Sequence, residues 1–328
     1  QPKPSRQTVA GYAAKWIERK APRLKPATER LYRSILDDRV IPALGTLYAD
    51  AVIRADVEEW VIWAEEQETP RGKPYADATL ARWWTCLGVL LKDMAADIGI
   101  ADPTARIERP NSSRKNIREA RTLTLEQLGE LLEVMRKDFA DWYTETLVMA
   151  YTGIRAGELY ALHWEDVEDD HLIIRRGVSD GEITDTKTHA ERVVYLPPLV
   201  SEAIKEHRLD MIARQHRGLS SGLVFPNSRG GVRRQWAIRK PLTTAKEMAG
   251  IKQKVTPQVL RRTYNTLLVQ AGVDRIVLRS QIGHSTERMT ELYSGVSLDA
   301  KKAAHTKVFS IGGVTSPSDT PKEGGSKK

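Results

Sequence analysis

The stretch TGIRAGELYALHWEDV, residues 152–167, contains a helix break, a second helix start and an arginine between them. Gly153 follows an apolar run and is expected to end one helix, so Arg155 stands at the start of the next. A helix N-terminus favours an anion through its free N–H groups and dipole, and a guanidinium fork matches two phosphate oxygens. Leu159 would tie this helix to the core, and Glu158 could pair with an arginine and orient it. Taken alone, the pattern is more typical of an exposed surface arginine.

A second stretch, VTPQVLRRTYNTLLVQAGV at 255–273, repeats this arrangement. Thr256 and Pro257 are favourable residues for a helix N-cap and first turn. Arg261 lies in the second turn beside the apolar stripe of the helix, where packing could hold it rigidly. Its neighbour Arg262 is expected to be solvated or to contact a DNA phosphate. The chain therefore carries two arginines at or near helix starts.

Two further segments carry polar groups of interest. DTKTHAERVVYLP (185–197) sets Lys187 in a hairpin before a strand, and IGHSTERMTELYSGV (282–296) sets His284 on a glycine turn. In the second segment Tyr293 recurs with apolar residues at the spacing of an amphipathic helix, which by itself favours a buried aromatic over a reactive one. Hairpin lysines and single loop histidines are most often solvated, so these local patterns alone assign no chemistry.

The organisation of the chain predicts two domains. The first hundred residues show helical stripes separated by turns at PALG and TPRGKPY, which predicts a bundle of four or five helices. HLIIRRG and ERVVYLP alternate as strands around a polar hairpin within otherwise helical sequence. We therefore expect a mainly α fold with a small antiparallel β-sheet in the second domain. The expected boundaries are a helical domain at 1–105, a polar, basic linker at 106–120, a second domain at 121–310 and a disordered tail at 311–328.

The charge of the chain favours a polyanionic partner. The net charge is +8, and residues 1–40 hold ten Lys or Arg against four Asp or Glu, whereas residues 41–70 hold one basic residue against seven acidic ones. Such asymmetry suggests one surface that faces DNA and another that faces solvent or a partner. A solvated helix face is the alternative for the basic residues of the first helices. The candidates for phosphate contacts are Arg19, Lys20, Arg23, Lys25, Arg30 and Arg33.

Several classes of protein are disfavoured by the sequence. Cys86 is the only cysteine, which excludes an intramolecular disulfide framework and a cysteine-rich zinc site. His207 and His216 are too far apart in sequence to share one helix face as metal ligands. No run approaches the roughly 18 apolar residues of a membrane span, and no phosphate-binding loop or zinc-protease motif is present. We expect a cytoplasmic protein without a metal or a cofactor.

Four segments taken in order nevertheless match a known pattern. TGIRAGELYALHWEDV, TKTHAERVVYLP, LRRTYNT and GHSTERMTELY together resemble the catalytic domain of the tyrosine recombinases, also called the phage integrase family. The resemblance spans about residues 121–300, and the first hundred residues look like the core-binding (SAM-like) domain of that family. It implies a two-domain clamp on double-stranded DNA and a site-specific recombinase that works through a 3′-phosphotyrosyl intermediate.

The resemblance also implies a role for each matched residue. Arg155 and Arg261 would clamp the scissile phosphate, and Lys187 would protonate the leaving 5′-oxygen. His284 would hydrogen-bond the phosphate, and Tyr293 would attack it. Glu158 matches an acidic residue of the family and would orient a neighbouring group.

One position departs from the family pattern. Gln258 stands where the family carries the histidine of its His-x-x-Arg box, and a glutamine cannot exchange a proton near neutral pH. A weakened protein that only binds DNA is therefore an alternative reading. A type IB topoisomerase-like enzyme, which uses similar chemistry, is another. The resemblance further implies a tetramer on two paired sites through the segment 297–309, where Ala303 and Val308 are apolar, and DNA-bending accessory proteins as possible partners.

Overall fold

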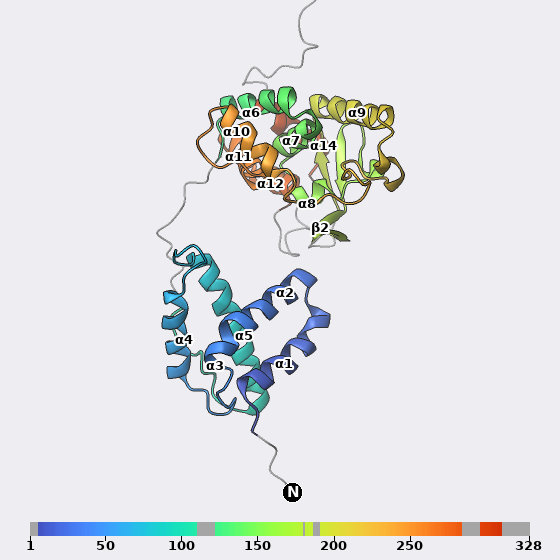
Figure 1. Ribbon diagram of the computed structural model, residues 1–328. Coiled ribbons are helices and arrows are strands. Elements are labelled where there is room, and N and C mark those ends of the chain that lie inside the picture. Colours follow the sequence, from blue (N-terminus) through green and yellow to red (C-terminus); the bar gives the residue numbers. More distant parts are fainter. Residues whose placement is uncertain (1–5, 110–121, 180, 186–190, 284–295, 310–328) are drawn as a thin grey trace, which may run out of the picture. The chain divides into compact units, whose positions relative to one another are not determined.

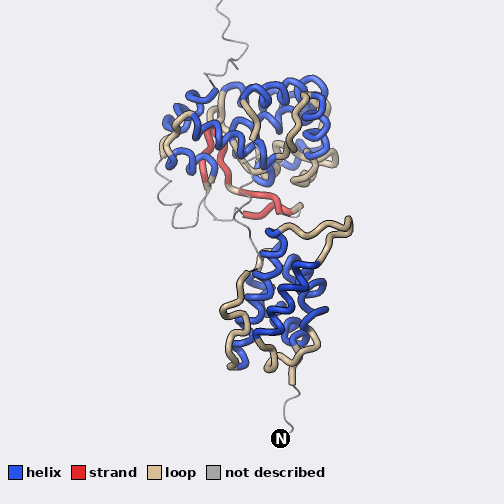
Figure 2. The backbone as a smooth tube through the Cα atoms, turned by 90° about the vertical axis from the view of Figure 1, so that its left-hand side faces the viewer, coloured by secondary structure: helices blue, strands red, loops and turns tan. Residues whose placement is uncertain are grey.

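The computed structural model describes residues 6–109, 122–179, 181–185, 191–283 and 296–309, and it divides the chain into two compact units, Gln1–Ile117 and Arg118–Lys328 (Figure 1). Each unit has its own hydrophobic core. Helices dominate both units, and the strands, red in Figure 2, lie in the second. The mainly α fold with small antiparallel sheets is the class expected from the sequence. Within the described ranges, every helix is too short or too polar to cross a lipid bilayer.

The first unit is a bundle of helices around a core rich in aromatic residues. Trp16 is almost fully buried and stacks on Tyr32, with 5.9 Å between the ring centroids. Gly99, with a φ of +74°, ends the last helix of the unit. The PALG segment, expected as a turn, contributes Pro42 to the first turn of a short helix, where proline is tolerated. The helices are α1 (Val9–Lys20), α2 (Pro26–Ile35), α3 (Ile41–Leu44), α4 (Arg54–Glu66) and α5 (Asp77–Ile98).

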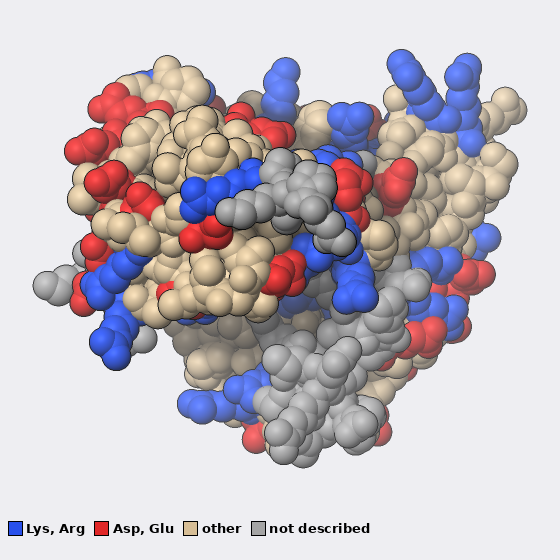
Figure 3. All heavy atoms as spheres, turned by 90° about the horizontal axis from the view of Figure 1, so that it is seen from below, with Lys and Arg blue, Asp and Glu red and all other residues tan. Residues whose placement is uncertain are grey.

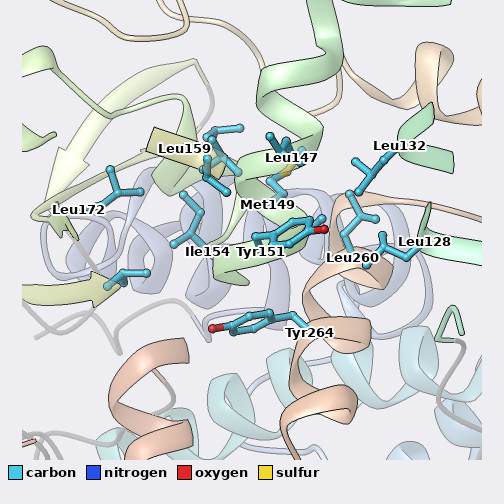
Figure 4. Close-up of a cluster of buried hydrophobic side chains, with 14 of the residues drawn as sticks. Leu128, Leu132, Leu147, Met149, Tyr151, Ile154, Leu159, Leu172, Leu260 and Tyr264 are labelled. Carbon is cyan, nitrogen blue, oxygen red and sulfur yellow. The ribbon is translucent and has the colours of Figure 1, made fainter. Parts of the chain in front are cut away.

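The second unit packs its helices around the apolar core shown in Figure 4. Its first helix begins at a capping box, in which the Thr124 hydroxyl accepts from the Gln127 backbone and the Gln127 side chain accepts from the Thr124 backbone. The helices are α6 (Leu125–Asp138), α7 (Ala140–Thr152), α8 (Ala156–Leu159), α9 (Pro198–Ala213), α10 (Arg239–Met248), α11 (Pro257–Gln270), α12 (Arg275–Ile282) and α14 (Leu298–Phe309).

The strands form two antiparallel pairs where the sequence predicts one sheet. β1 (His171–Ile174) pairs with β4 (Arg192–Tyr195), and β2 (Arg176–Ser179) pairs with β3 (Glu182–Asp185). The segment expected as a single strand at 171–177 therefore changes partner at Arg175. Alternate residues of β1 are buried in the core, while Gly181, with a φ of +88°, reverses the chain between β2 and β3.

The C-terminal helix α14 packs onto its own unit. His305 and Phe309 are buried, and their rings stack with 4.4 Å between centroids beside Tyr151. Of the two residues expected to contact a neighbouring subunit, Val308 is buried in its own core and Ala303 is exposed. In the single chain this segment therefore covers its own domain with its apolar face.

Candidate active site

Arg155 reaches the site through a sharp turn between two helices. α7 ends at Gly153, which has a φ of +65°, and Arg155 is the N-cap of α8. A Cβ atom on Gly153 would lie 2.5 Å from the Tyr264 ring, so only glycine fits this turn without movement. The Arg155 side chain is 46% exposed and can meet a ligand.

Glu158 holds Arg155 from one turn further along the chain. One carboxylate oxygen accepts from the Arg155 backbone N–H at 2.8 Å, and the other accepts from Arg155 Nη1 at 2.9 Å. The Glu158 side chain is only 8% exposed. The expectation that Glu158 pairs with an arginine thus matches the geometry.

A second arginine on the same carboxylate was not foreseen from the sequence. Arg192, in β4, donates Nη1 to Glu158 Oε1 at 3.1 Å and Nη2 to Glu158 Oε2 at 2.6 Å. This two-point pair is mostly buried, with 15% of the Arg192 side chain exposed. The only signal in the sequence is an arginine directly before the apolar run VVYL, at a position where an inward-pointing charge needs a partner.

These contacts keep Glu158 ionised. Burial acts to raise the pKa of Glu158, but the charge and hydrogen bonds of Arg192, with the backbone N–H and charge of Arg155, outweigh it and lower the pKa to about 2. The carboxylate is therefore a fixed negative charge across the whole neutral range, and it can anchor both guanidinium groups.

Arg261 is the most deeply buried arginine of the site. It lies on α11, which begins at the expected Thr256 cap, and it donates Nη1 to the Gly153 carbonyl at 2.6 Å and Nη2 to the Ile282 carbonyl at 2.7 Å. The residue is 3% exposed. Burial, with the charge of Arg155 adding to it, lowers the pKa of Arg261 to about 9, so it stays protonated at neutral pH.

The C-terminal end of α12 brings the two predicted arginines together. The Ile282 carbonyl accepts from Arg261, and the Gly283 carbonyl accepts from Arg155 Nη2 at 3.2 Å. Carbonyls at a helix end carry partial negative charge and favour such cations. Three guanidinium groups around one carboxylate leave two positive charges (three minus one), so this arrangement can bind and stabilise an anion such as a phosphate.

The remaining predicted site residues are placed only in part. Gln258 is exposed in the first turn of α11, three residues before Arg261 and so near it on the helix surface. Arg262 is exposed beside it. Lys187, between β3 and β4 in the chain, and the pair His284 and Tyr293, between α12 and α14, lie outside the described residues.

Three basic residues predicted to contact DNA in the first unit have acidic partners. Arg19 pairs with Asp97 and Lys20 with Asp93, each at 2.8 Å. The third residue, Arg33, pairs with Glu18 and Glu29. Figure 3 shows one face of the molecule, on which Lys and Arg lie among Asp and Glu side chains. Arg23, Lys25 and Arg30 are exposed, and Arg30 also has a polar or electrostatic interaction within the described part of the chain.

In the part of the chain that the structure describes, no three His, Cys, Asp or Glu side chains gather as a metal ion would require. The site described above relies on guanidinium groups for its positive charge.

The sequence is similar to those of known integrases and tyrosine recombinases. A model of the Phage integrase family matches residues 121–298. The integrase of Mycobacterium phage FRAT1 is 27% identical over 317 residues, which cover 94% of this chain and 90% of the phage protein. Tyrosine recombinase XerD of Mycobacterium tuberculosis is 27% identical over 289 residues, covering 83% of this chain and 85% of XerD.

Solved structures share the fold. The integrase of transposon Tn1549 in complex with a circular intermediate DNA aligns with a TM-score of 0.72 at 19% identity, covering 90% of this chain and 98% of that one. A lambda integrase tetramer bound to a Holliday junction aligns with a TM-score of 0.63 at 14% identity, covering 85% of this chain and 78% of that one. At sequence identities of 19% and 14%, these similarities show a shared fold.

Proposed function

This chain belongs to the phage integrase family of tyrosine recombinases, and we propose that it is a site-specific recombinase that cleaves and rejoins double-stranded DNA through a 3′-phosphotyrosyl intermediate. The observation that carries the proposal is the convergence of Arg155 and Arg261 on the end of α12, with Glu158 anchoring the first of them. From there the chain continues directly to His284 and, nine residues later, to Tyr293.

The chemistry suits these residue types. Attack by a phenol on a phosphodiester places extra negative charge on the non-bridging oxygens, and two arginines in a water-poor site stabilise that charge without a metal. A free tyrosine has a pKa of about 10, so nearby cations are needed to favour its ionised form. Arg261, held by two backbone carbonyls, keeps a fixed orientation for this task.

In the proposed cleavage, the Tyr293 phenol loses its proton to solvent, its oxygen bonds to the phosphorus and the bond to the 5′-oxygen breaks. Lys187 gives its proton to that leaving oxygen, and His284 hydrogen-bonds a phosphate oxygen. The 3′-phosphotyrosyl bond retains the energy of the broken phosphodiester, so a 5′-hydroxyl from a partner strand can reverse the step and release Tyr293 without ATP. Gln258 can hydrogen-bond the phosphate but cannot exchange a proton, so we expect it to affect rate more than reaction type.

We further propose that both units bind the same duplex and that recombination uses a tetramer on two paired sites. The lambda integrase tetramer bound to a Holliday junction supports this assembly. DNA-bending accessory proteins are further candidate partners. Because the apolar face of α14 covers its own domain, subunit contacts through the C-terminal segment would use its outward face. That face carries the exposed residues Lys302, Ala303, Thr306 and Lys307.

A nicked suicide substrate tests the proposal. A duplex taken from the junction of the encoding element, nicked beside the cleavage point, loses the short 5′-hydroxyl strand after attack and traps the covalent adduct. The wild-type chain should form this adduct, and the Tyr293→Phe variant should bind the duplex with similar affinity but form none. Adduct in the Phe variant would mean that another residue is the nucleophile.

The same assay separates the alternatives. A recombinase joins strands between two sites, a topoisomerase-like enzyme relaxes a supercoiled plasmid without pairing sites, and a binding protein shifts the duplex without any adduct. Failure of the wild-type chain to form an adduct on its own junction DNA would reject the proposed reaction and leave DNA binding alone.

A further inference from the structure

Arg192 has no part in the reaction proposed above, although it lies within the same cluster of charges. We propose that Arg192 is a positioning residue for DNA cleavage: it holds the Glu158 carboxylate and the Gly283 backbone, and through them it sets the position and the free charge of Arg155. This inference rests on the proposed function, because its consequence is measured as cleavage.

The first argument is the hydrogen bonding of Glu158. Its Oε1 accepts from Arg155 Nη1 and Arg192 Nη1, and its Oε2 accepts from the Arg155 backbone N–H and Arg192 Nη2. A carboxylate has about four acceptor sites, so these two arginines fill them. Removing Arg192 would empty half of the sites on a nearly buried anion, where desolvation makes an unpaired charge costly.

The second argument is the charge that Arg155 can offer an anion. Glu158 with Arg155 alone would form a neutral pair. With Arg192 present, the carboxylate is shared by two guanidinium groups, and the three residues carry one net positive charge (two minus one). Arg155 is the half-exposed member and Arg192 is mostly buried, so the net charge is presented through Arg155. Stabilisation of a phosphate depends on that charge.

The third argument is the contact between Arg192 and the turn that ends α12. A Cβ atom on Gly283 would lie 2.8 Å from both Cζ and Nε of Arg192, so the guanidinium packs directly against this glycine. Gly283 has a φ of +72°, and its carbonyl accepts from Arg155. Gly283 therefore lies between two guanidinium groups, immediately before His284 in the chain.

The charged groups around Glu158 and Arg192 come from four elements. Arg155 lies at the start of α8, Arg192 on β4 and Arg261 on α11. Lys301 of α14 donates to the next carbonyl of β4 at 2.7 Å; burial and then the charge of Arg192 lower the pKa of Lys301 to about 8. All four are cations, so loss of Arg192 removes the closest partner of Glu158 and leaves Arg155 to hold it.

The test compares Arg192→Met, Arg192→Lys and the double variant Arg192→Met with Glu158→Gln in the full chain. Arg176→Met is the matched control, because Arg176 lies on the neighbouring β2 and pairs with the buried Asp166 without touching Glu158. The readouts are duplex affinity, thermal unfolding, and the single-turnover rate of adduct formation on the suicide substrate near neutral pH.

We expect Arg192→Met to lower the cleavage rate about 10–100-fold, the loss typical of a residue that orients an active-site group through hydrogen bonds. Duplex affinity should change little. Arg192→Lys, which keeps charge but not the fork, should fall between. The double variant, in which a neutral amide at position 158 no longer cancels the charge of Arg155, should recover part of the rate that Arg192→Met loses.

Hydrogen–deuterium exchange supplies a readout that does not require cleavage. The peptide containing the end of α12 should exchange faster in Arg192→Met and not in Arg176→Met. If wild-type enzyme forms adduct and Arg192→Met forms it at the wild-type rate, the positioning role is wrong while the reaction stands. If the wild type forms no adduct, the reaction is wrong, and unchanged exchange at α12 in Arg192→Met would then overturn the positioning role as well. If Arg192→Met does not fold, Arg192→Lys takes its place. The ratio of its cleavage rate to the wild-type rate and the exchange at the end of α12 then test the positioning role.

Discussion

Arg155 and Arg261 donate hydrogen bonds to successive carbonyl oxygens at the end of α12, Gly283 for the first and Ile282 for the second. They come from α8 and α11, two elements that are far apart in the sequence. Because both side chains bind the end of α12, this helix end fixes the spacing of the two guanidinium groups before a ligand binds. An anion site organised in this way loses little freedom on binding its ligand.

The buried arginine gives the first prediction. Arg261→Lys should lower the single-turnover cleavage rate by roughly 100-fold or more, because one ammonium group cannot reproduce the planar fork between the Gly153 and Ile282 carbonyls. Duplex affinity, measured by gel shift, should change little. Arg262→Lys, at the exposed neighbouring position, is the control and should cleave normally. Equal rates in both variants would remove Arg261 from the site.

The turn before Arg155 gives a prediction about stability. Gly153→Ala should lower the free energy of unfolding by about 2–4 kcal/mol, because it adds left-handed strain to a methyl group placed 2.5 Å from the Tyr264 ring. Urea unfolding followed by circular dichroism measures the loss. Gly129→Ala, in the open surroundings of α6, should instead be stabilising by about 0.5–1 kcal/mol. Equal effects would show that the turn tolerates a side chain.

Gln258 gives a prediction about rate. Gln258→His should leave the cleavage rate equal or higher near pH 7, because histidine can both hydrogen-bond a phosphate and exchange a proton. The exposed position in the first turn of α11 accepts the new ring without repacking. Single-turnover adduct formation between pH 6 and 8 measures it. A large loss of rate would indicate that the glutamine amide has an adapted role in this chain.

His305 gives a prediction about pH. Burial lowers the pKa of His305 to about 3, below its ordinary value of about 6.5. The folded state therefore disfavours protonation, and its stability should fall as the pH falls below 6.5, by about 2 kcal/mol at pH 5. His305→Phe, which keeps a ring against Phe309, should lose much less between pH 7.5 and 5 in urea unfolding. Parallel losses in both proteins would contradict this account.

The first unit gives a prediction about DNA binding. Lys25 is exposed and has no acidic partner among the described residues, whereas Arg19 is bound to Asp97. Lys25→Ala should weaken duplex binding and reduce the slope of log affinity against log salt by about 1. Arg19→Ala should have a smaller effect, because part of its charge is already compensated. The opposite order, measured by fluorescence anisotropy at several salt concentrations, would place the DNA on another face of this unit.

Local chemistry accounts for the parts of the fold that could be predicted. Gly153 predicts where α7 ends, and the Thr256–Pro257 pair predicts where α11 begins. Both could be predicted because a left-handed turn and a helix cap depend on neighbouring residues alone. The change of strand partner at Arg175 could not be predicted in this way. No proline or glycine stands at this position to mark the change, and the choice between two partner strands is a property of the folded core.

The site shows the same division. Arg155 and Glu158 are three residues apart, so their pairing could be predicted from helical spacing. Arg192 could not, because its partner lies 34 residues away and only the folded chain brings them together. The stripe of α14 likewise predicts that one face is buried, but it does not say whether the covered surface belongs to the same chain or to a neighbour.

The antiparallel ladder of β1 and β4 has an evolutionary corollary. Leu172 and Val194 face each other in this ladder and are both fully buried. The core therefore holds the strands on both sides of the connecting segment 175–191. Insertions and deletions between strands leave the inward register of β1 and β4 untouched, whereas the same changes inside a strand, β2 and β3 included, would invert its register. Lineages descended from this chain should thus vary in length between residues 186 and 191, in the segment that carries Lys187.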